Sequence, residues 1–236
     1  MEHEVLESLS AECFWPATKA EERAAEIIHR SFQTRGFFRS RVRDVELHLL
    51  DEAAEIKPAA VIATVQEGNL YRLAKVSFVE GAEEPSTVPI STMRAMFEIQ
   101  DGEILNVEEI AKGLESLRKL FGEQGYINFT PVPDTIVDES TKTVALKIDL
   151  DKGIQFRISR IRFVGAPAVG EKLSELCPLK PGDIYNTAKF QQFFEQYRGL
   201  LPPDFRLDQH AYVEHNTADS TIEITVKICF PGFYCF

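Results

Sequence analysis

Residues 65–81 read VQEGNLYRLAKVSFVEG, and the chain returns to nearly the same text at residues 150–165, LDKGIQFRISRIRFVG. The spacing is the same throughout, because Gly68 and Gly153 are 85 positions apart and so are Phe78 and Phe163. Both stretches follow the pattern Gly-x-x-aromatic-Arg-aliphatic-x-basic-aliphatic-x-Phe-Val, with an acidic residue shortly before the glycine. A recurrence of this length is typical of an array of small structural units.

The recurrence divides the chain into three repeats, which we define as residues 1–68, 69–153 and 154–236. Hydrophobic periodicity, together with the Gly and Asn residues that interrupt it, predicts the order β-α-α-β-β for the second repeat. Its expected elements are a strand at 71–79, a short helix at 92–97, a long helix from Asn106 to Gly125, and strands at 126–133 and 143–150.

The first and third repeats follow the same order, and each departs from it once. The first predicts helix, helix, strand, strand, without a copy of the opening strand, and its long helix ends at Gly36, which is 89 positions before Gly125. In the third, residues 182–186 (GDIYN) match residues 102–106 (GEILN). Where the other repeats have glycine followed by an aromatic residue, the third has Pro202-Pro203. Because proline supplies no backbone donor, we expect its long helix to end early.

The repeated strand carries two phases of alternation. The side chains of Tyr71 and Leu73 fall on one face and those of Val76 and Phe78 on the other, and the second copy does the same. Since a strand over a single core keeps one phase, we interpret the start of each copy as the part that packs against the preceding repeat. An arginine there could bind an anion, but we favour a stem that covers apolar surface. The predicted joint residues are Tyr71, Arg72, Leu73, Phe156, Arg157 and Ile158.

The composition is that of an ordinary globular protein. The 236 residues are 44% hydrophobic, which is ample for packed cores, and carry a net charge of −11 from 26 basic and 37 acidic residues. This charge argues against nucleic acid and anionic lipid as partners. There is no apolar run long enough for a membrane helix. The start of the chain is acidic, unlike a signal peptide, so either the chain is cytoplasmic or a targeting segment has been removed.

Residues that could carry chemistry have simpler interpretations. The five histidines are scattered and no C-x-x-C is present, so we expect no catalytic residue, no metal and no cofactor. Cys177 lies on an apolar helical face and is interpreted as a small core residue. Pro231-Gly232 would fold Cys229 and Cys235 together, and a disulfide between them would require an oxidising compartment. Trp15 aligns with Ile104 at the same offset of 89, which favours core packing over a partner anchor.

Tandem β-α-α-β-β repeats joined by this strand pattern resemble POTRA (polypeptide-transport-associated) domains, the modules that precede the barrel in BamA-like outer-membrane assembly factors of the surface antigen family. The resemblance covers nearly the whole chain. It implies an α+β fold in which each repeat has a three-stranded mixed sheet with two helices on one face. The residues that carry it are Glu67-Gly68, Tyr71-Arg72-Leu73, Phe78, Gly81, Gly102–Asn106, Asp151, Gly153, Phe156-Arg157-Ile158, Phe163, Gly165 and Gly182–Asn186.

The resemblance also implies a function. It implies a non-catalytic scaffold or chaperone module at the periplasmic face of the outer membrane, which binds unfolded outer-membrane clients or secreted polypeptides and accessory assembly proteins. The alternative is an envelope adaptor, for example of the cell-division type, that recruits a folded partner; an enzyme is a distant third. A barrel of ~16 strands needs more chain than these 236 residues offer, so we expect a fragment of a longer protein that has the barrel and signal peptide elsewhere.

In a unit of this kind the last strand is central, which leaves the second strand at an edge where a client strand could be added. The second repeat has Pro131 and Pro133 on that strand, and proline offers no donor. The predicted client edge is therefore in the third repeat, or in the first repeat near Val45 to Leu49. In the third repeat it comprises Arg206, Leu207, Asp208, Gln209, His210, Ala211, Tyr212 and Val213.

Overall fold

The structure is a computed structural model that describes residues 15–51, 53, 57–80 and 88–230. The first repeat comprises η1 (Ala17–Lys19), α2 (Ala20–Gln33), β1 (Arg41–Leu49) and β2 (Ala59–Gln66). The second comprises β3 (Arg72–Glu80), α3 (Ile90–Ala95), α4 (Val107–Gly122), β4 (Thr130–Asp138) and β5 (Thr143–Asp151). The third comprises β6 (Arg157–Val164), α5 (Pro167–Leu176), α6 (Thr187–Gln196), η2 (Arg198–Leu200), α7 (Leu207–His210), β7 (Ala211–Asn216) and β8 (Thr221–Lys227). The helix predicted near Val5 and Leu9 lies outside the described residues.

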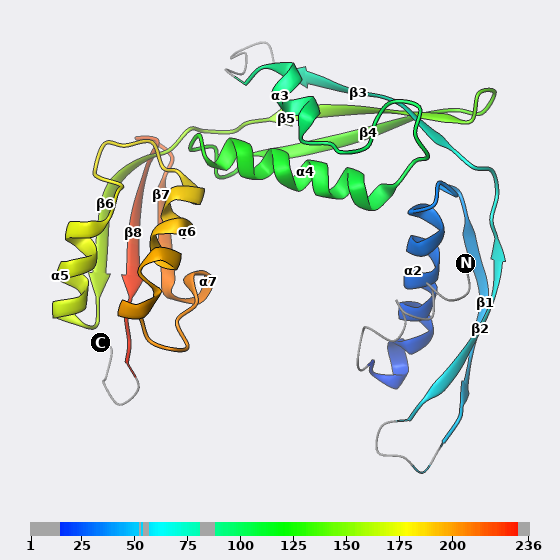
Figure 1. Ribbon diagram of the computed structural model, residues 1–236, viewed down its shortest axis with the longest axis horizontal. Helices are drawn as coiled ribbons and strands as arrows, with labels where there is room; N and C mark the ends of the chain where they lie inside the picture. The colour runs from blue at the N-terminus through cyan, green and yellow to red at the C-terminus, as the bar shows by residue number, and fades with distance from the viewer. Residues whose placement is uncertain (1–14, 52, 54–56, 81–87, 231–236) are drawn as a thin grey trace. The chain divides into compact units, whose positions relative to one another are not determined.

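The described strands form three separate sheets (Figure 1). β1 pairs with β2, and the two three-stranded sheets have the orders β3-β5-β4 and β6-β8-β7. In both three-stranded sheets the strand that comes last in sequence lies in the middle. The third sheet is mixed, because β6 runs parallel to β8 whereas β7 runs antiparallel to it. The predicted α+β fold class is confirmed.

The middle strand of the third sheet shows why the helices share one face. Ile222, Ile224 and Val226 are fully buried, and the residues between them are partly exposed. The three buried side chains belong to one core with Leu173 of α5 and Phe190 of α6. Burial of one such aliphatic side chain contributes about 1.5–3 kcal/mol. The period-two pattern of β8 therefore fixes which face the two helices cover.

The long helices begin at the predicted asparagine caps. Asn106 Oδ1 accepts hydrogen bonds from the backbone N–H groups of Glu108 (3.0 Å) and Glu109 (3.3 Å), and Asn106 Nδ2 donates to Glu109 Oε1. Asn186 Oδ1 likewise accepts from Lys189 N at 2.8 Å. The spacing of Thr18 and Glu21 predicts a capping box for the long helix of the first repeat, and this prediction is wrong. α2 begins at Ala20, directly after the 3-10 turn η1, and neither has a side-chain cap.

A β-bulge replaces the predicted switch of packing partner in the repeated strand. In β6, Ile158 pairs with Ile222 but Arg160 already pairs with Glu223, so Ser159 is an extra residue. An extra residue reverses the alternation that follows it. Phe156 and Ile158 before the bulge and Ile161 and Phe163 after it consequently pack into the same core. The interpretation of the two phases as two packing partners is therefore wrong in the third repeat.

The early end of the third long helix is confirmed. α6 has 10 residues against 16 in α4, and it is followed by η2 before Pro202-Pro203. The guanidinium group of Arg198 donates hydrogen bonds to the carbonyl oxygens of Pro202 (3.0 Å) and Pro203 (2.6 Å). α6 thus ends before the prolines, and their carbonyl oxygens accept hydrogen bonds from Arg198 of the following turn η2.

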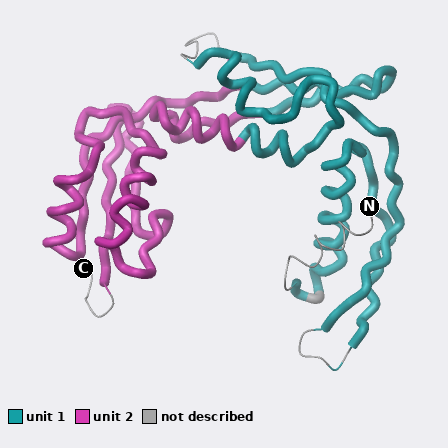
Figure 2. The backbone as a smooth tube through the Cα atoms, viewed as in Figure 1, with its two compact units in different colours: residues 1–79, 86–114, 133–149 teal, residues 80–85, 115–132, 150–236 magenta. Residues whose placement is uncertain are grey.

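The chain divides into two compact units (Figure 2). One contains residues 1–79, 86–114 and 133–149, and the other contains residues 80–85, 115–132 and 150–236. The division passes through the second repeat, so each compact unit contains one junction between successive repeats. The boundaries of the three predicted domains stay a prediction.

Candidate functional site

The corresponding strands β1, β4 and β7 of the three repeats each lie at an edge of their sheet, where backbone groups are open to pairing with another strand. In β1 a bulge breaks this edge: Arg43 pairs with Thr64 and Glu46 with Ile62, so Asp44 and Val45 face a single residue. Asp44 has φ 49°, a left-handed conformation that costs most side chains about 1–2 kcal/mol. A bulge of this kind bends an edge away from an incoming strand.

The edge of β4 is interrupted by proline. Pro131 and Pro133 lie within the strand, two positions apart, and neither has an N–H to offer. Their missing donors fall on the same side of the strand. An added strand would lose two hydrogen bonds in succession there, which makes β4 a poor template.

The edge of β7 is regular. Its six residues pair one to one with β8, from Ala211 opposite Val226 to Asn216 opposite Thr221, without a register shift. The strand contains no proline. Of the three second strands that the structure describes, β7 alone combines an even register with a complete set of backbone donors.

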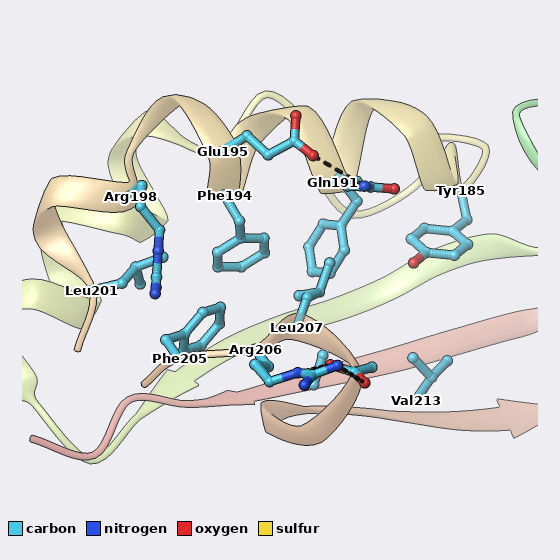
Figure 3. A pocket seen from close by; sticks show the side chains of 13 residues that line it. Tyr185, Gln191, Phe194, Glu195, Arg198, Leu201, Phe205, Arg206, Leu207 and Val213 are labelled. Carbon is cyan, nitrogen blue, oxygen red and sulfur yellow. Dashed lines mark hydrogen bonds and ion pairs between the residues drawn. The ribbon is translucent and has the colours of Figure 1, made fainter. Parts of the chain in front are cut away.

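An apolar pocket of about 610 Å³ adjoins β7 (Figure 3). Ala211 and Val213 line it from the strand, and the side chain of Tyr212 between them is directed to the other face, where its ring lies 5.0 Å from Lys227 Nζ. The remaining walls come from α6, η2, α7 and the loops next to them. The apolar members of these walls are Tyr185, Phe190, Phe194, Leu201, Phe205 and Leu207, and the polar members are Gln191, Glu195, Arg198, Arg206 and Asp208.

The predicted client edge at 206–213 is partly wrong. Residues 207–210 form the helical turn α7, in which the carbonyl oxygen of Arg206 accepts from the N–H groups of Gln209 (3.1 Å) and His210 (3.0 Å). The cause is tertiary, because Phe205 stacks on Phe194 at 5.5 Å and on the ring of His210 at 4.9 Å. The strand consequently begins at Ala211 and extends to Asn216, while α7 supplies a wall of the pocket.

The two junctions between repeats share one backbone arrangement. The N–H of Tyr71 donates to the carbonyl oxygen of Gly36 at 2.8 Å, and the N–H of Phe156 donates to that of Gly125 at 3.0 Å. Both glycines have positive φ, 89° and 86°. A Cβ on Gly125 would lie 2.8 Å from Ile184 Cγ2 and 2.9 Å from Phe156 O. Glycine is required there by conformation and by space.

The first junction adds a network of charged side chains. Glu139 accepts a hydrogen bond from Tyr71 Oη (2.8 Å) and forms ion pairs with Lys142 (3.0 Å) and Arg39. The Lys142 ammonium and the Tyr71 hydroxyl lower the pKa of Glu139 below its ordinary value of 4.5. The same carboxylate raises the pKa of Tyr71 above 10.0. Arg39 belongs to the first repeat and Glu139 to the second, so this network bridges the junction.

The second junction uses uncharged amides. Gln155 Nε2 donates to Gln124 O at 2.9 Å, and Asn186 Nδ2 donates to Glu123 O at 2.8 Å. The ring of Phe156 is fully buried in the core of the third repeat and lies 5.4 Å from the ring of His215. Backbone geometry is thus common to both junctions, and the side chains differ.

A family model described as POTRA, surface antigen variable number repeat, matches residues 71–153. Residues 71–153 thus match one POTRA domain, and the chain as a whole resembles tandem POTRA domains. Over 140 residues it is 23% identical to the outer membrane protein assembly factor BamA of Buchnera aphidicola subsp. Acyrthosiphon pisum (strain APS), a match that covers 59% of this chain and 22% of that protein.

Two solved structures have the same fold. A crystal structure of Haemophilus influenzae BamA POTRA3-5 matches with a TM-score of 0.64 at 17% identity, over 92% of this chain and 84% of that one. BamA from Haemophilus ducreyi lacking POTRA domains 1-3 matches with a TM-score of 0.55 at 15% identity, over 68% of this chain and 29% of that one. The chain thus covers less than two thirds of the BamA relative and of the second structure.

The arginines of the repeated strand pattern make a contact that the sequence did not predict. Arg72 Nη1 donates to Gly102 O at 2.8 Å and Arg157 Nη1 donates to Gly182 O at 3.0 Å. Each arginine therefore holds the loop before the long helix of its own repeat. Leu73 is fully buried and its N–H binds Glu103 O in that loop, and Ile158 lies in the third core. Among the predicted joint residues, Tyr71 and Phe156 bond to the preceding repeat through their backbone N–H groups.

Two cysteines of the third repeat have contrasting states. Cys177 is a free thiol in the third core, as predicted, and burial raises its pKa. Cys229 is disulfide-bonded. The predicted partner, Cys235, lies outside the described residues, so the pairing stays a prediction.

Within residues 15–51, 53, 57–80 and 88–230, His, Cys, Asp and Glu side chains form no group of three or more that could hold a metal ion. In the same part of the chain, none of the helices has the length and apolar character that crossing a membrane requires.

Proposed function

We propose that this chain is a non-catalytic periplasmic scaffold that holds unfolded polypeptides during outer-membrane protein assembly, and that β7 of the third repeat is its client-binding edge. The POTRA match and the BamA relative support the setting. The even, proline-free register of β7 next to an apolar pocket carries the assignment of the edge. A disulfide at Cys229 fits an oxidising compartment.

The chemistry of the edge favours an extended client with alternating apolar side chains. A strand added to β7 would form its hydrogen bonds through the backbone, which makes them independent of client sequence. Every second side chain of that strand would face the side on which Ala211 and Val213 line the pocket. Strands of membrane barrels alternate apolar and polar residues in this way, so their unfolded segments match the site.

Amide exchange of the full chain with and without an unfolded peptide of alternating apolar residues tests the proposal. We expect protection to appear at residues 211–216. Leu207→Asp places a charge in the pocket wall and is expected to weaken binding about tenfold, the equivalent of about 1.4 kcal/mol. Tyr212→Ala is the matched control, because this side chain is half exposed on the opposite face, and it should leave affinity nearly unchanged.

Two outcomes would overturn this assignment. Protection at residues 126–133 with none at 211–216 would place the client on the second repeat. Binding of a folded envelope protein, with no protection of β7 by any unfolded peptide, would instead favour the adaptor function. Each outcome is read from the same exchange map.

A further inference from the structure

The pocket beside β7 results from the early end of the third long helix. α4 continues for 16 residues in the second repeat, whereas α6 stops after 10. The segment that follows α6, through η2 and α7, supplies Arg198, Leu201, Phe205 and Leu207 to the walls of this pocket of about 610 Å³ (Figure 3). The departure of the third repeat from the common pattern therefore creates an enclosed apolar space.

One polar group that faces this space has no partner. Tyr185 precedes α6 and is only 8% exposed, and its hydroxyl is directed into the pocket (Figure 3). Within the described part of the chain this hydroxyl makes no hydrogen bond. Burial raises the pKa of Tyr185 to about 12, so the hydroxyl is protonated at neutral pH and is a donor. Because an enclosed donor without an acceptor costs free energy, a ligand oxygen that accepts from it would be stabilised.

The second repeat has an apolar residue at the aligned position. Tyr185 in GDIYN corresponds to Leu105 in GEILN, 80 positions earlier. Both side chains are buried, and Leu105 is 1% exposed. Leucine thus satisfies the packing requirement of this position. The hydroxyl of Tyr185 is an addition that the fold does not require, and it points to a ligand.

The charges around the pocket balance one another. Arg206 lies 3.4 Å from Asp208, and Glu195 accepts a hydrogen bond from Gln191 at 3.0 Å. The guanidinium group of Arg198 donates to two backbone carbonyl oxygens. The lining thus has two positive and two negative side chains, each with a partner. Since burial of an unpaired charge is costly, these walls favour an uncharged occupant.

We propose that this pocket binds a small uncharged amphiphile, which has an aliphatic body and one oxygen that accepts a hydrogen bond from Tyr185 Oη. Apolar walls with a few polar groups are typical of small-molecule sites, and Phe190, Phe194 and Phe205 form such walls here. A cavity of about 150 Å³ is enough for benzene, so this pocket accommodates a longer chain. The site goes beyond the proposed function, because it requires neither a client nor a strand added to β7.

Titration of the full chain with 1-octanol tests the proposal, with the methyl signals of Leu201, Leu207 and Val213 as the NMR readout. We expect saturable shifts, and about fourfold weaker binding of 1-heptanol because it buries one methylene fewer. Tyr185→Phe keeps the ring and removes only the hydroxyl, so the affinity for 1-octanol should fall about three- to tenfold. Tyr212→Phe is the matched control on the other face of the sheet and should leave the affinity unchanged.

Two further ligands test the chemistry without any substitution. 1-Chlorooctane keeps the chain but lacks the oxygen, so it should bind the unsubstituted chain about three- to tenfold more weakly than 1-octanol. Octanoate adds a negative charge and should bind at least about tenfold more weakly. These comparisons hold even if Tyr185→Phe disturbs folding.

Several results would overturn the proposal. Shifts that do not saturate would mean simple partition of the alcohol into apolar surface. Equal binding of 1-octanol and 1-chlorooctane would remove the role of the hydroxyl, and tighter binding of octanoate would indicate an anion site at Arg198 and Arg206. An unfolded peptide that protects residues 211–216, together with no saturable binding of 1-octanol, would assign the pocket to client side chains. Failure of the peptide to protect β7 leaves the octanol result unaffected, so the two proposals fail separately.

Discussion

The two junctions between repeats are built on the same backbone and differ in the side chains around it. At both, a left-handed glycine accepts a hydrogen bond from the N–H of an aromatic residue that begins the next repeat. The first junction then adds the Arg39–Glu139 ion pair and the Tyr71 hydroxyl, whereas the second adds two amide hydrogen bonds and buries Phe156 in a core. The comparison teaches that the same backbone joint accommodates either a charged network or neutral amides around it.

The largest expected effect is a difference in stability between substitutions of the two junction aromatic residues, Phe156 and Tyr71. Phe156→Ala removes a completely buried ring from the third core and is expected to destabilise that repeat by about 3–5 kcal/mol. Tyr71→Phe keeps the ring and removes only the hydroxyl that binds Glu139, so it should loosen the first junction with little loss of stability. Melting curves of both variants check this. A small loss of stability for Phe156→Ala, with altered scattering dimensions, would mean that its ring serves the junction and not the core.

The next effect tests the shared glycine. Gly125→Ala places a Cβ within 3 Å of Ile184 and of the carbonyl of Phe156 and also forces alanine into a left-handed conformation. We expect a loss of about 2–4 kcal/mol from strain and overlap together. Gly182→Ala is the matched control, since Gly182 has φ 93° but nothing within 4 Å of its Cβ position, and it should cost only about 1–2 kcal/mol. Chemical denaturation measures both, and equal losses would show that the overlap is relieved by movement of Ile184.

Much of this architecture was readable from local sequence. Asn106 and Asn186 predicted the starts of the long helices, and Pro202-Pro203 predicted the early end of the third one. The recurring strand predicted the repeats. Each of these signals depends on residues that are close together in the sequence. Gly36 and Gly125, which are 89 positions apart, were also recognised in the sequence, but they were interpreted only as the ends of helices. Their role at the junction depends on the strand that begins 30 or more residues later.

The wrong predictions concern segments whose local structure depends on contacts with residues that are not their immediate neighbours in the sequence. Residues 207–210 alternate weakly and were predicted as strand, but the stacking of Phe205 on Phe194 makes them a helical turn. The phase change in β6 comes from a bulge at Ser159, and sequence alternation alone does not distinguish a bulge from a second packing partner. Arg39 and Glu139 are 100 positions apart, and nothing near either residue signals their contact.

A smaller effect is expected from the charged network. Glu139→Gln removes the charge that pairs with Arg39 and Lys142 while keeping an acceptor for Tyr71 Oη. Exposed ion pairs contribute little to folding, so we expect an unchanged melting temperature and faster amide exchange at Tyr71, whose N–H crosses the junction. Gln155→Ala is the corresponding change at the second junction, because it removes the amide that donates to Gln124 O, and it should raise exchange at Phe156 only. Faster exchange at both sites in either variant would mean that the junctions are coupled.

The smallest effect is a dependence on pH that only the first junction should show. The pKa of Glu139 is lowered below 4.5, mainly by Lys142 and then by Tyr71. A carboxylate of this kind stabilises the folded state above its unfolded pKa, and the contribution is lost as the pH falls through the lower folded value. The pKa of Tyr71 is raised above 10.0 by Glu139, so its contribution is complete below 10.0 and is lost as the pH rises through the folded value.

The first junction should therefore be tightest between the pKa of Glu139 and the pKa of Tyr71. It should loosen when acid protonates Glu139 and when alkali deprotonates Tyr71, and the acid change is the easier one to measure. The neighbouring Asp138 should titrate at a lower pH than this change, because hydrogen bonds from Ser140 and Thr141 lower its pKa to about 2. Spin-label distances across each junction, measured as the pH is lowered from 6 through the folded pKa of Glu139, should broaden at the first and stay constant at the second, whose bridging contacts are neutral amides. Glu139→Gln should abolish the response. An equal response at both junctions, or one that survives this substitution, would assign the pH dependence to general acid unfolding.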